Sequence, residues 1–208
     1  MPLRHAHDWD KAVDGREVYF RRDIKLHFGE PRFLVPNRGM KLRRSDGSHL
    51  TDVDAAILDR ETGSLALVQL KWPDVYGLSP TERESKRLNF LKANEWVDRV
   101  AGWVAGRSAK QVAKALGLGN GASDSKPPIF LVIPRYTARF TLNDRLDDRA
   151  AWVAWPEVVR MRIENKQVAD PLMELECDFR GGGPLAPYDL PEEIAYRLHQ
   201  LEVRVLVV

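Results

Sequence analysis

TDVDAAILDRETGSLALVQLKWP, residues 51–73, is the stretch of sequence that decides the fold. It holds two largely apolar runs that are joined by the turn sequence RETG at 60–63. Apolar runs on either side of a short turn that contains glycine are typical of a β-hairpin. The second run is apolar on both faces, which indicates a central strand covered on both sides. We therefore predict two paired strands, at 49–59 and 64–72.

The polar side chains that bear on function are Asp52 and Asp54 on the first strand and Gln69 and Lys71 on the second. Side chains alternate along a strand, so Asp52 and Asp54 share one face of the first strand, and Gln69 and Lys71 share one face of the second. If the RETG turn sets the pairing, Asp54, Gln69 and Lys71 meet on one side of the sheet with Asp52 close by. A shift of the pairing by one residue would separate them.

Lys71 is the most informative of the four. Lysine in a central apolar strand is rarely buried without a partner, which favours a functional role over a structural one. For Asp54 taken alone, a structural role at the start of a strand is the simpler interpretation. Gln69 carries information only through its spacing from Lys71.

A helix is predicted before the hairpin, at 8–28. One face of it carries Val13, Glu17, Phe20, Ile24 and Phe28. Glu17 is a carboxylate on an otherwise apolar stripe. Two interpretations of it stay open: Glu17 pairs with Arg21 one helical turn on, or it contributes a carboxylate to the site.

The rest of the pattern predicts the order of the elements. After the hairpin we expect a long helix from 79 to about 106, a short helix at 108–119, strands at 129–134 and 150–155, helices at 156–165 and 190–202, and a final strand at 203–208. The α-β-β-β-α-β order of the first part implies an α/β fold with a mixed central sheet flanked by helices. We expect residues 1–140 to form the core and 141–208 to form a C-terminal extension packed on the same domain.

The polar cluster suits phosphodiester hydrolysis. Mg²⁺ and Mn²⁺ prefer oxygen ligands. Asp54 would supply the anchoring carboxylate, Gln69 a neutral amide oxygen, and Asp52 or Glu17 a further carboxylate. Lys71 would hold the attacking water and offset charge on the phosphate.

Asp54 followed across a hairpin by Gln69-Leu70-Lys71 resembles the signature of PD-(D/E)XK nucleases, in the Q-x-K form associated with Mrr-like restriction endonucleases. A helical glutamate ahead of Asp52-Val53-Asp54 also resembles the Holliday-junction-resolvase branch. The resemblance implies a restriction-endonuclease-like core and a metal-dependent nuclease, with Asp54, Gln69 and Lys71 as catalytic positions and Glu17 as a further one. Gln69 replaces the usual acid, and no proline precedes Asp52 or Asp54.

Charge and composition bear on partners and location. The net charge is only +2, but residues 16–44 hold nine Lys or Arg against three acids. Beside the site, this excess predicts a phosphate-attracting surface. The candidate nucleic-acid contacts are Lys41, Arg43 and Arg44, with Arg83, Lys86 and Arg87 on the long helix. One cysteine, no zinc spacing, no apolar leader and no membrane span predict a cytoplasmic protein.

The sequence thus favours an Mg²⁺-dependent endonuclease acting on DNA, in restriction, phage defence or repair, as a homodimer or with a partner protein. A second interpretation keeps the fold and drops the chemistry: an inactive nuclease-like module that binds nucleic acid or another protein, with Gln69 as the position where metal binding was lost. A third is an α/β domain whose hairpin register keeps the polar residues apart.

Overall fold

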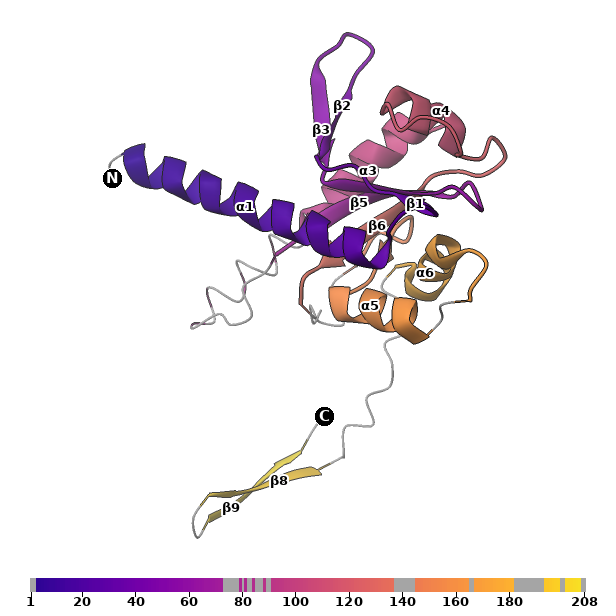
Figure 1. Ribbon diagram of the computed structural model, residues 1–208. Helices are drawn as coiled ribbons and strands as arrows, with labels where there is room; N and C mark the ends of the chain where they lie inside the picture. The colour runs from indigo at the N-terminus through magenta and orange to yellow at the C-terminus, as the bar shows by residue number, and fades with distance from the viewer. Residues whose placement is uncertain are drawn as a thin grey trace.

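The computed structural model describes residues 3–72, 79, 81, 84, 88, 91–136, 145–164, 167–181, 193–198 and 201–206. This part of the chain is mixed α/β, with five helices and a five-stranded sheet in the order β1-β4-β5-β6-β7 (Figure 1). The strands are β1 (Phe33–Leu34), β4 (Ala55–Asp59), β5 (Leu65–Lys71), β6 (Ile129–Pro134) and β7 (Ala151–Trp152). The first three pair antiparallel, and β5, β6 and β7 pair parallel. The predicted α/β class with a mixed sheet is confirmed.

The hairpin around the RETG turn forms in the register that clusters the polar residues. Ala55 lies opposite Val68 and Leu58 lies opposite Leu65, which brings Asp54 to the level of Gln69. Both strands are fully buried along their apolar runs. The register is strongly determined because a shift by one residue would turn each apolar set toward the wrong layer.

Helices cover both faces of the sheet and make two separate cores (Figure 1). On one face pack α1 (Leu3–His27), α5 (Trp155–Glu164) and α6 (Pro171–Phe179). On the other pack α3 (Ala93–Val104) and α4 (Ala109–Ala115). β4 and β5 supply side chains to both cores, which explains their apolar sequence on both faces.

The predicted single strand at 49–59 is wrong, because the chain changes partner at Asp54. Residues before it form β3 (His49–Val53), which pairs with β2 (Met40–Arg43), and residues after it form β4. The β2–β3 hairpin therefore leaves the sheet and stands away from it (Figure 1). Gly39 permits the close approach at this bend, since a Cβ there would lie 3.1 Å from the Val53 carbonyl oxygen.

The helices after the hairpin largely follow the sequence pattern. In α3, Ala93, Val97, Val100 and Val104 are buried as their spacing predicts, and the helix ends two residues before Gly106. The predicted helix start at Ser79-Pro80 lies largely outside the described residues. α4 begins with a capping box, in which Ser108 and Gln111 satisfy each other's backbone N–H groups.

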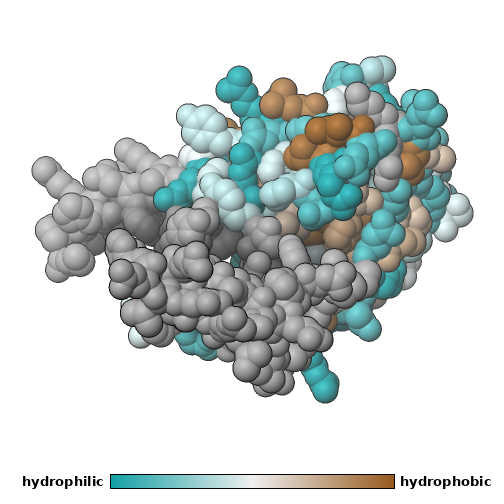
Figure 2. All heavy atoms as spheres, turned by 90° about the horizontal axis from the view of Figure 1, so that it is seen from below, coloured by the Kyte–Doolittle hydropathy of each residue, from teal (hydrophilic) through white to brown (hydrophobic). Residues whose placement is uncertain are grey.

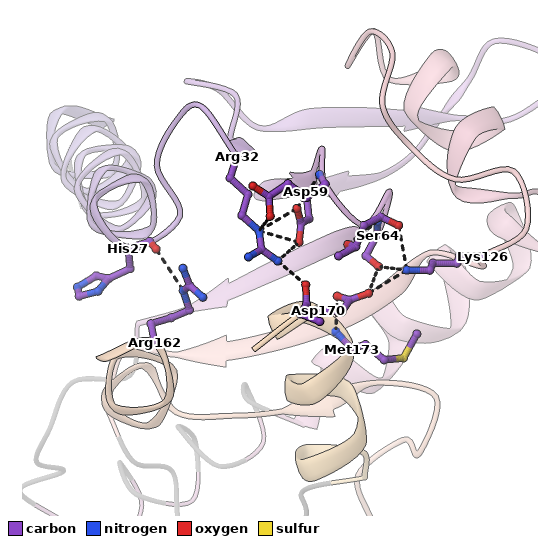
Figure 3. A network of polar contacts seen from close by, with 11 residues as sticks. His27, Arg32, Asp59, Ser64, Lys126, Arg162, Asp170 and Met173 are labelled. Carbon is purple, nitrogen blue, oxygen red and sulfur yellow. Dashed lines mark hydrogen bonds and ion pairs between the residues drawn. The ribbon is translucent and has the colours of Figure 1, made fainter. Parts of the chain in front are cut away.

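Helix α6 is attached to the sheet by a network of polar contacts at its N-terminus (Figure 3). Asp170 caps the N-terminus of α6 through Met173 N (3.1 Å) and accepts hydrogen bonds from Ser64 Oγ and Lys126 Nζ. Beside it, Arg32 holds the fully buried Asp59 with two guanidinium nitrogens and also donates to the Ala169 carbonyl. The network joins the β4–β5 turn, the segment before β6 and the start of α6.

The predicted helix at 190–202 is wrong. The backbone there forms a two-stranded antiparallel hairpin, β8 (Glu193–Leu198) and β9 (Leu201–Leu206), with Leu198 opposite Leu201. The sequence LEVRVL at 201–206 is rich in β-branched residues, which have high strand propensity. Pairing with that strand outweighs the helical spacing of the residues before it.

The surface seen from below shows small groups of hydrophobic residues separated by hydrophilic ones over its described part (Figure 2). On α1, Val18, Tyr19 and Leu26 are exposed, and on α5 Ile163 is. Within the described residues, no helix has the length and apolar character that crossing a membrane requires.

Candidate functional site

Three elements bring the candidate residues to one edge of the sheet. Asp54 lies at the bend between β3 and β4. Gln69 and Lys71 lie beside it, at the C-terminal end of β5. Helix α1 brings Glu17 and Arg21 to the same place, since Arg21 Nη1 donates to the Asp54 carbonyl oxygen (3.1 Å). The arrangement thus combines residues that are 54 positions apart in sequence at most.

Asp54 is a buried carboxylate held in one orientation. Asp54 is 7 % exposed, and its Oδ2 accepts hydrogen bonds from Leu70 N (2.7 Å) and from the Gln69 amide. Burial, and after it the nearby Glu17 carboxylate, raise the pKa of Asp54 to about 7, against the lowering effect of Leu70 N, Gln69 and Lys71. A carboxylate in this state takes up a proton or a cation readily at neutral pH.

Lys71 is the cationic counterpart of Asp54. It is partly buried at the end of β5, and burial lowers the pKa of its ammonium, with Lys92 acting in the same direction and Asp54 and Glu17 opposing. Among the described residues, no hydrogen bond or ion pair is formed by its side chain. A lysine retained for structure would be expected to pair, and none of the described residues provides Lys71 with such a partner.

Gln69 positions Asp54 in the structure. Its Nε2 donates to Asp54 Oδ2, as expected for residues opposite each other on adjacent strands. Rotation of the amide by half a turn would present its carbonyl oxygen at the same place. The side chain is therefore able to serve as a hydrogen-bond donor to the carboxylate or as an oxygen ligand beside it.

Glu17 forms the pair with Arg21 that one of its two interpretations predicted. It pairs with Arg21 one helical turn on, at 3.4 Å, and its side chain is 41 % exposed. It also lies close enough to Asp54 and Lys71 to act on the pKa of each. Glu17, on the face of α1 that packs toward the sheet, thus places its carboxylate at the rim of the site.

Two arginines contact the site although the sequence did not predict them there, namely Arg21 and Arg135. Arg21 is 9 % exposed, and its Nε is the single buried side-chain nitrogen or oxygen without a hydrogen-bond partner in the described part of the chain. Arg135 follows β6, donates its backbone N–H to the Lys71 carbonyl (2.7 Å) and pairs with Asp23 of α1. The i,i+4 spacing from Glu17 signalled Arg21, but the contact with Asp54 is tertiary.

Asp52 does not join the site cluster, although the sequence placed it close to Asp54. Its carboxylate is 56 % exposed and lies 3.1 Å from His49 Nε2 on the outward side of the β2–β3 hairpin. The reason is the bend at Asp54: the alternation of side chains that would have put both aspartates on one face ends where the strand leaves the sheet.

The basic candidates divide into two groups. Lys41, Arg43 and Arg44 are exposed on the β2–β3 hairpin, which continues directly into Asp54. Arg83, Lys86 and Arg87 lie outside the described residues. Among the described residues, the basic surface predicted from the sequence therefore begins at the site and follows the β2–β3 hairpin.

The donor atoms at the site are of the type that Mg²⁺ and Mn²⁺ prefer. Asp54 and Glu17 offer carboxylate oxygens and Gln69 an amide oxygen, all hard ligands. The two carboxylates repel each other, since Glu17 raises the pKa of Asp54, and a divalent cation would relieve that repulsion. No cluster of three or more His, Cys, Asp or Glu with metal-binding geometry occurs in the described residues. An ion here would keep water ligands, as Mg²⁺ commonly does.

Comparison of the chain with family models, with curated proteins and with solved structures finds no match.

Proposed function

We propose that this protein is a metal-dependent nuclease that hydrolyses phosphodiester bonds in DNA, with a restriction-endonuclease-like core. The observation that carries the proposal is the pairing of a buried carboxylate, Asp54, with a partly buried ammonium, Lys71, that makes no ion pair among the described residues. The pKa of each is moved toward neutrality by burial. Perturbed groups of opposite sign at one edge of a sheet are characteristic of sites that transfer protons or bind charged substrates.

The element order supports the proposed core. Helix α1, the strands β1, β4 and β5, helix α3 and strand β6 follow in the α-β-β-β-α-β order that the sequence pattern predicted, with β2, β3 and α4 inserted between them. Asp54, Gln69 and Lys71 come from the hairpin that the Q-x-K signature requires. The three residues converge on one edge, as a shared catalytic role demands.

Each residue has a distinct part in the proposed reaction. Asp54 and Glu17 would hold a divalent cation, which would supply an activated water and polarise the phosphate. Gln69 fixes the orientation of the Asp54 carboxylate. Lys71 donates a hydrogen bond to the attacking water and offsets the negative charge that gathers on the phosphate oxygens.

Arg21 adds positive charge to the site. Leaving a buried N–H unsatisfied costs about 1–3 kcal/mol, so its Nε would gain from an acceptor oxygen such as one of a phosphate. Arg21 also donates to the Asp54 carbonyl and so links the position of the carboxylate to that of the helix.

The second candidate function is an inactive nuclease-like module that binds nucleic acid or a partner protein. Gln69 favours it, because a neutral amide replaces an acid and weakens the attraction for a cation. Lys71 opposes it, since binding without catalysis gives no reason to bury a lysine in this strand.

The test is a titration of Mg²⁺ and Mn²⁺ into the full chain with labelled duplex, single-stranded and branched DNA. Asp54→Ala and Lys71→Ala are compared with Lys114→Ala, which removes an exposed lysine of α4. We expect metal-dependent cleavage in the wild type and in Lys114→Ala and none in the two site variants. Binding that is indifferent to metal and to both site variants, without cleavage, would instead establish the inactive module.

A further inference from the structure

The β2–β3 hairpin is a ribbon with two different faces. Cross-strand pairs place Leu42 opposite Thr51 and Met40 opposite Val53. Leu42 and Val53 are fully buried in the core that contains α3. The alternate positions, among them Lys41 and Arg43, point outward and are exposed. One face thus belongs to the core and the other is presented to solvent.

Two tryptophans of α3 fix the ribbon in place. Trp96 Nε1 donates to the Asp52 carbonyl (2.7 Å) and Trp103 Nε1 donates to the Arg43 carbonyl (2.8 Å), so that each strand is held once. The guanidinium of Arg107 lies over the Trp103 ring at 4.2 Å from its centroid. A hairpin that served only to reverse the direction of the chain would not need a hydrogen bond from each of its strands to a helix.

The outward face and tip carry an excess of positive charge. The cations are Lys41, Arg43 and Arg44, with Arg38 at the base. The acids of this face are engaged locally: Asp46 accepts from Ser48 N (2.8 Å) in the turn, and Asp52 lies against His49. The arginines donate to carbonyls of the ribbon itself, Arg43 to Gly47 and Arg44 to His49, which holds the cationic groups along the ribbon.

The ribbon leads directly into the site. Val53, the last residue of β3, is followed by Asp54. Five strand residues extend about 17 Å, which corresponds to about five base steps of B-form DNA. The tip of the ribbon and the candidate catalytic carboxylate would therefore lie within half a turn of one duplex.

We propose that the β2–β3 hairpin is the duplex-binding element of the protein, with its outward face in the major groove of B-form DNA. The inference rests on the proposed nuclease function for its role in placing a phosphate at Asp54. The major groove admits a two-stranded ribbon. The deep, narrow major groove of A-form RNA does not. Single-strand binders stack bases on aromatic side chains, and no Phe, Tyr or Trp is present on the described outward face.

The first experiment measures binding in EDTA, where cleavage cannot occur. Labelled duplex DNA, its single strand and duplex RNA are titrated with the full chain at several salt concentrations. The double variant Lys41→Ala/Arg43→Ala is compared with Arg160→Ala/Arg180→Ala, which removes the same charge from α5 and from the residue that follows α6, on the opposite face of the sheet. We expect duplex affinity to fall about 10- to 100-fold in the ribbon variant, and its logarithmic salt slope to fall by about two. The control should bind as the wild type does.

A second experiment tests the fixed placement of the ribbon. Trp103→Phe keeps a ring under Arg107 but removes the donor to the Arg43 carbonyl. Trp152→Phe removes an indole bond of the same kind, to the Asp147 carbonyl, away from the ribbon. We expect Trp103→Phe to weaken duplex binding severalfold and Trp152→Phe to leave it unchanged where both remain folded by circular dichroism.

The outcomes separate this inference from the proposed function. Ribbon variants that bind duplex DNA as the wild type does, or a wild type that prefers single strands or duplex RNA, would overturn the ribbon proposal even if the enzyme cleaves. Ribbon-dependent duplex binding without cleavage in Mg²⁺ or Mn²⁺ would retain it and reject the nuclease.

Discussion

At the scale of single residues, burial sets the chemistry of Asp54 and Lys71. Each carries a charge that the surrounding core disfavours, and each lies beside the buried apolar side chains of β4 and β5. Such placement costs stability and persists where function requires it. Substituting either residue should therefore reveal the stability lost by burying its charge.

Asp54→Asn should change how stability depends on pH. A carboxyl whose pKa is about 7 in the folded protein and near 4 when unfolded binds more protons in the folded state between those values. Its contribution is therefore present below about pH 4 and is lost as the pH rises to about 7, by up to roughly 4 kcal/mol. Urea unfolding in EDTA at a series of pH values should show Asp54→Asn gaining on the wild type as pH rises. A difference that does not vary with pH would contradict the assigned pKa.

Lys71→Met should stabilise the protein while removing cleavage. Methionine fills a similar volume and has no charge to desolvate, which is the main cause of the lowered pKa of Lys71. A gain of about 1 kcal/mol corresponds to about 2–4 °C in Tm for a chain of this size. Calorimetry would measure it beside Lys114→Met, where the exposed side chain predicts no gain. A drop in Tm would mean that Lys71 is held by structural contacts.

At the scale of elements, the attachment of α6 depends on one carboxylate. Asp170 joins the β4–β5 turn, the segment before β6 and the helix N-terminus (Figure 3). Burial tends to raise the pKa of Asp170, but hydrogen bonds from Ser64 and Lys126 outweigh it and lower that pKa. A lowered carboxyl pKa means that its stabilising effect is present above about pH 4 and is lost as the pH falls below it.

Asp170→Ala should destabilise the protein by about 1–3 kcal/mol at pH 7, because it removes a helix cap and leaves Lys126 and Ser64 without their acceptor. Asp178→Ala, at an exposed position of the same helix, should change stability by less than about 0.5 kcal/mol. Chemical denaturation at pH 7 and pH 3 measures both. The deficit of Asp170→Ala should shrink at pH 3; an equal deficit at both values would rule out the carboxylate as its source.

At the scale of the whole molecule, the two cores meet along the hairpin that carries the site. Helices α1, α5 and α6 pack on one face of β4 and β5, and α3 and α4 on the other. The site therefore forms only in the assembled fold, and a ligand that binds it should stabilise the entire described domain.

Mg²⁺ or Mn²⁺ should therefore raise Tm in the absence of DNA. A ligand that binds only the folded state at about 100 times its dissociation constant stabilises by about 2.7 kcal/mol. The rise should be absent in Asp54→Ala, while Asp52→Ala, whose carboxylate lies on the exposed ribbon, should respond as the wild type does. Scanning fluorimetry with Ca²⁺ and without divalent ions completes the series. A rise that persists in Asp54→Ala would place the cation elsewhere.

The sequence alone determined the features that depend on local spacing. A spacing of about 3.6 residues predicted the buried stripes of α1 and α3, because apolar residues must face a core at that interval. Continuous apolar runs bounded by turn residues predicted the central hairpin and the short strand β6. The RETG turn and the alternation along two strands predicted that Asp54 and Gln69 would meet, since a different register would have exposed the apolar set.

Only the tertiary structure decided where the hairpin strand ends and what surrounds it. The bend at Asp54, which removes Asp52 from the site, comes from competition between β2 and β5 for the same chain. The contact of Arg21 with the Asp54 carbonyl and the hydrogen bonds from Trp96 and Trp103 to the ribbon join residues whose proximity no local pattern encodes. Burial, and with it the pKa values of Asp54 and Lys71, depends on every layer of the fold, and for that reason it could be suspected from the sequence but not determined by it.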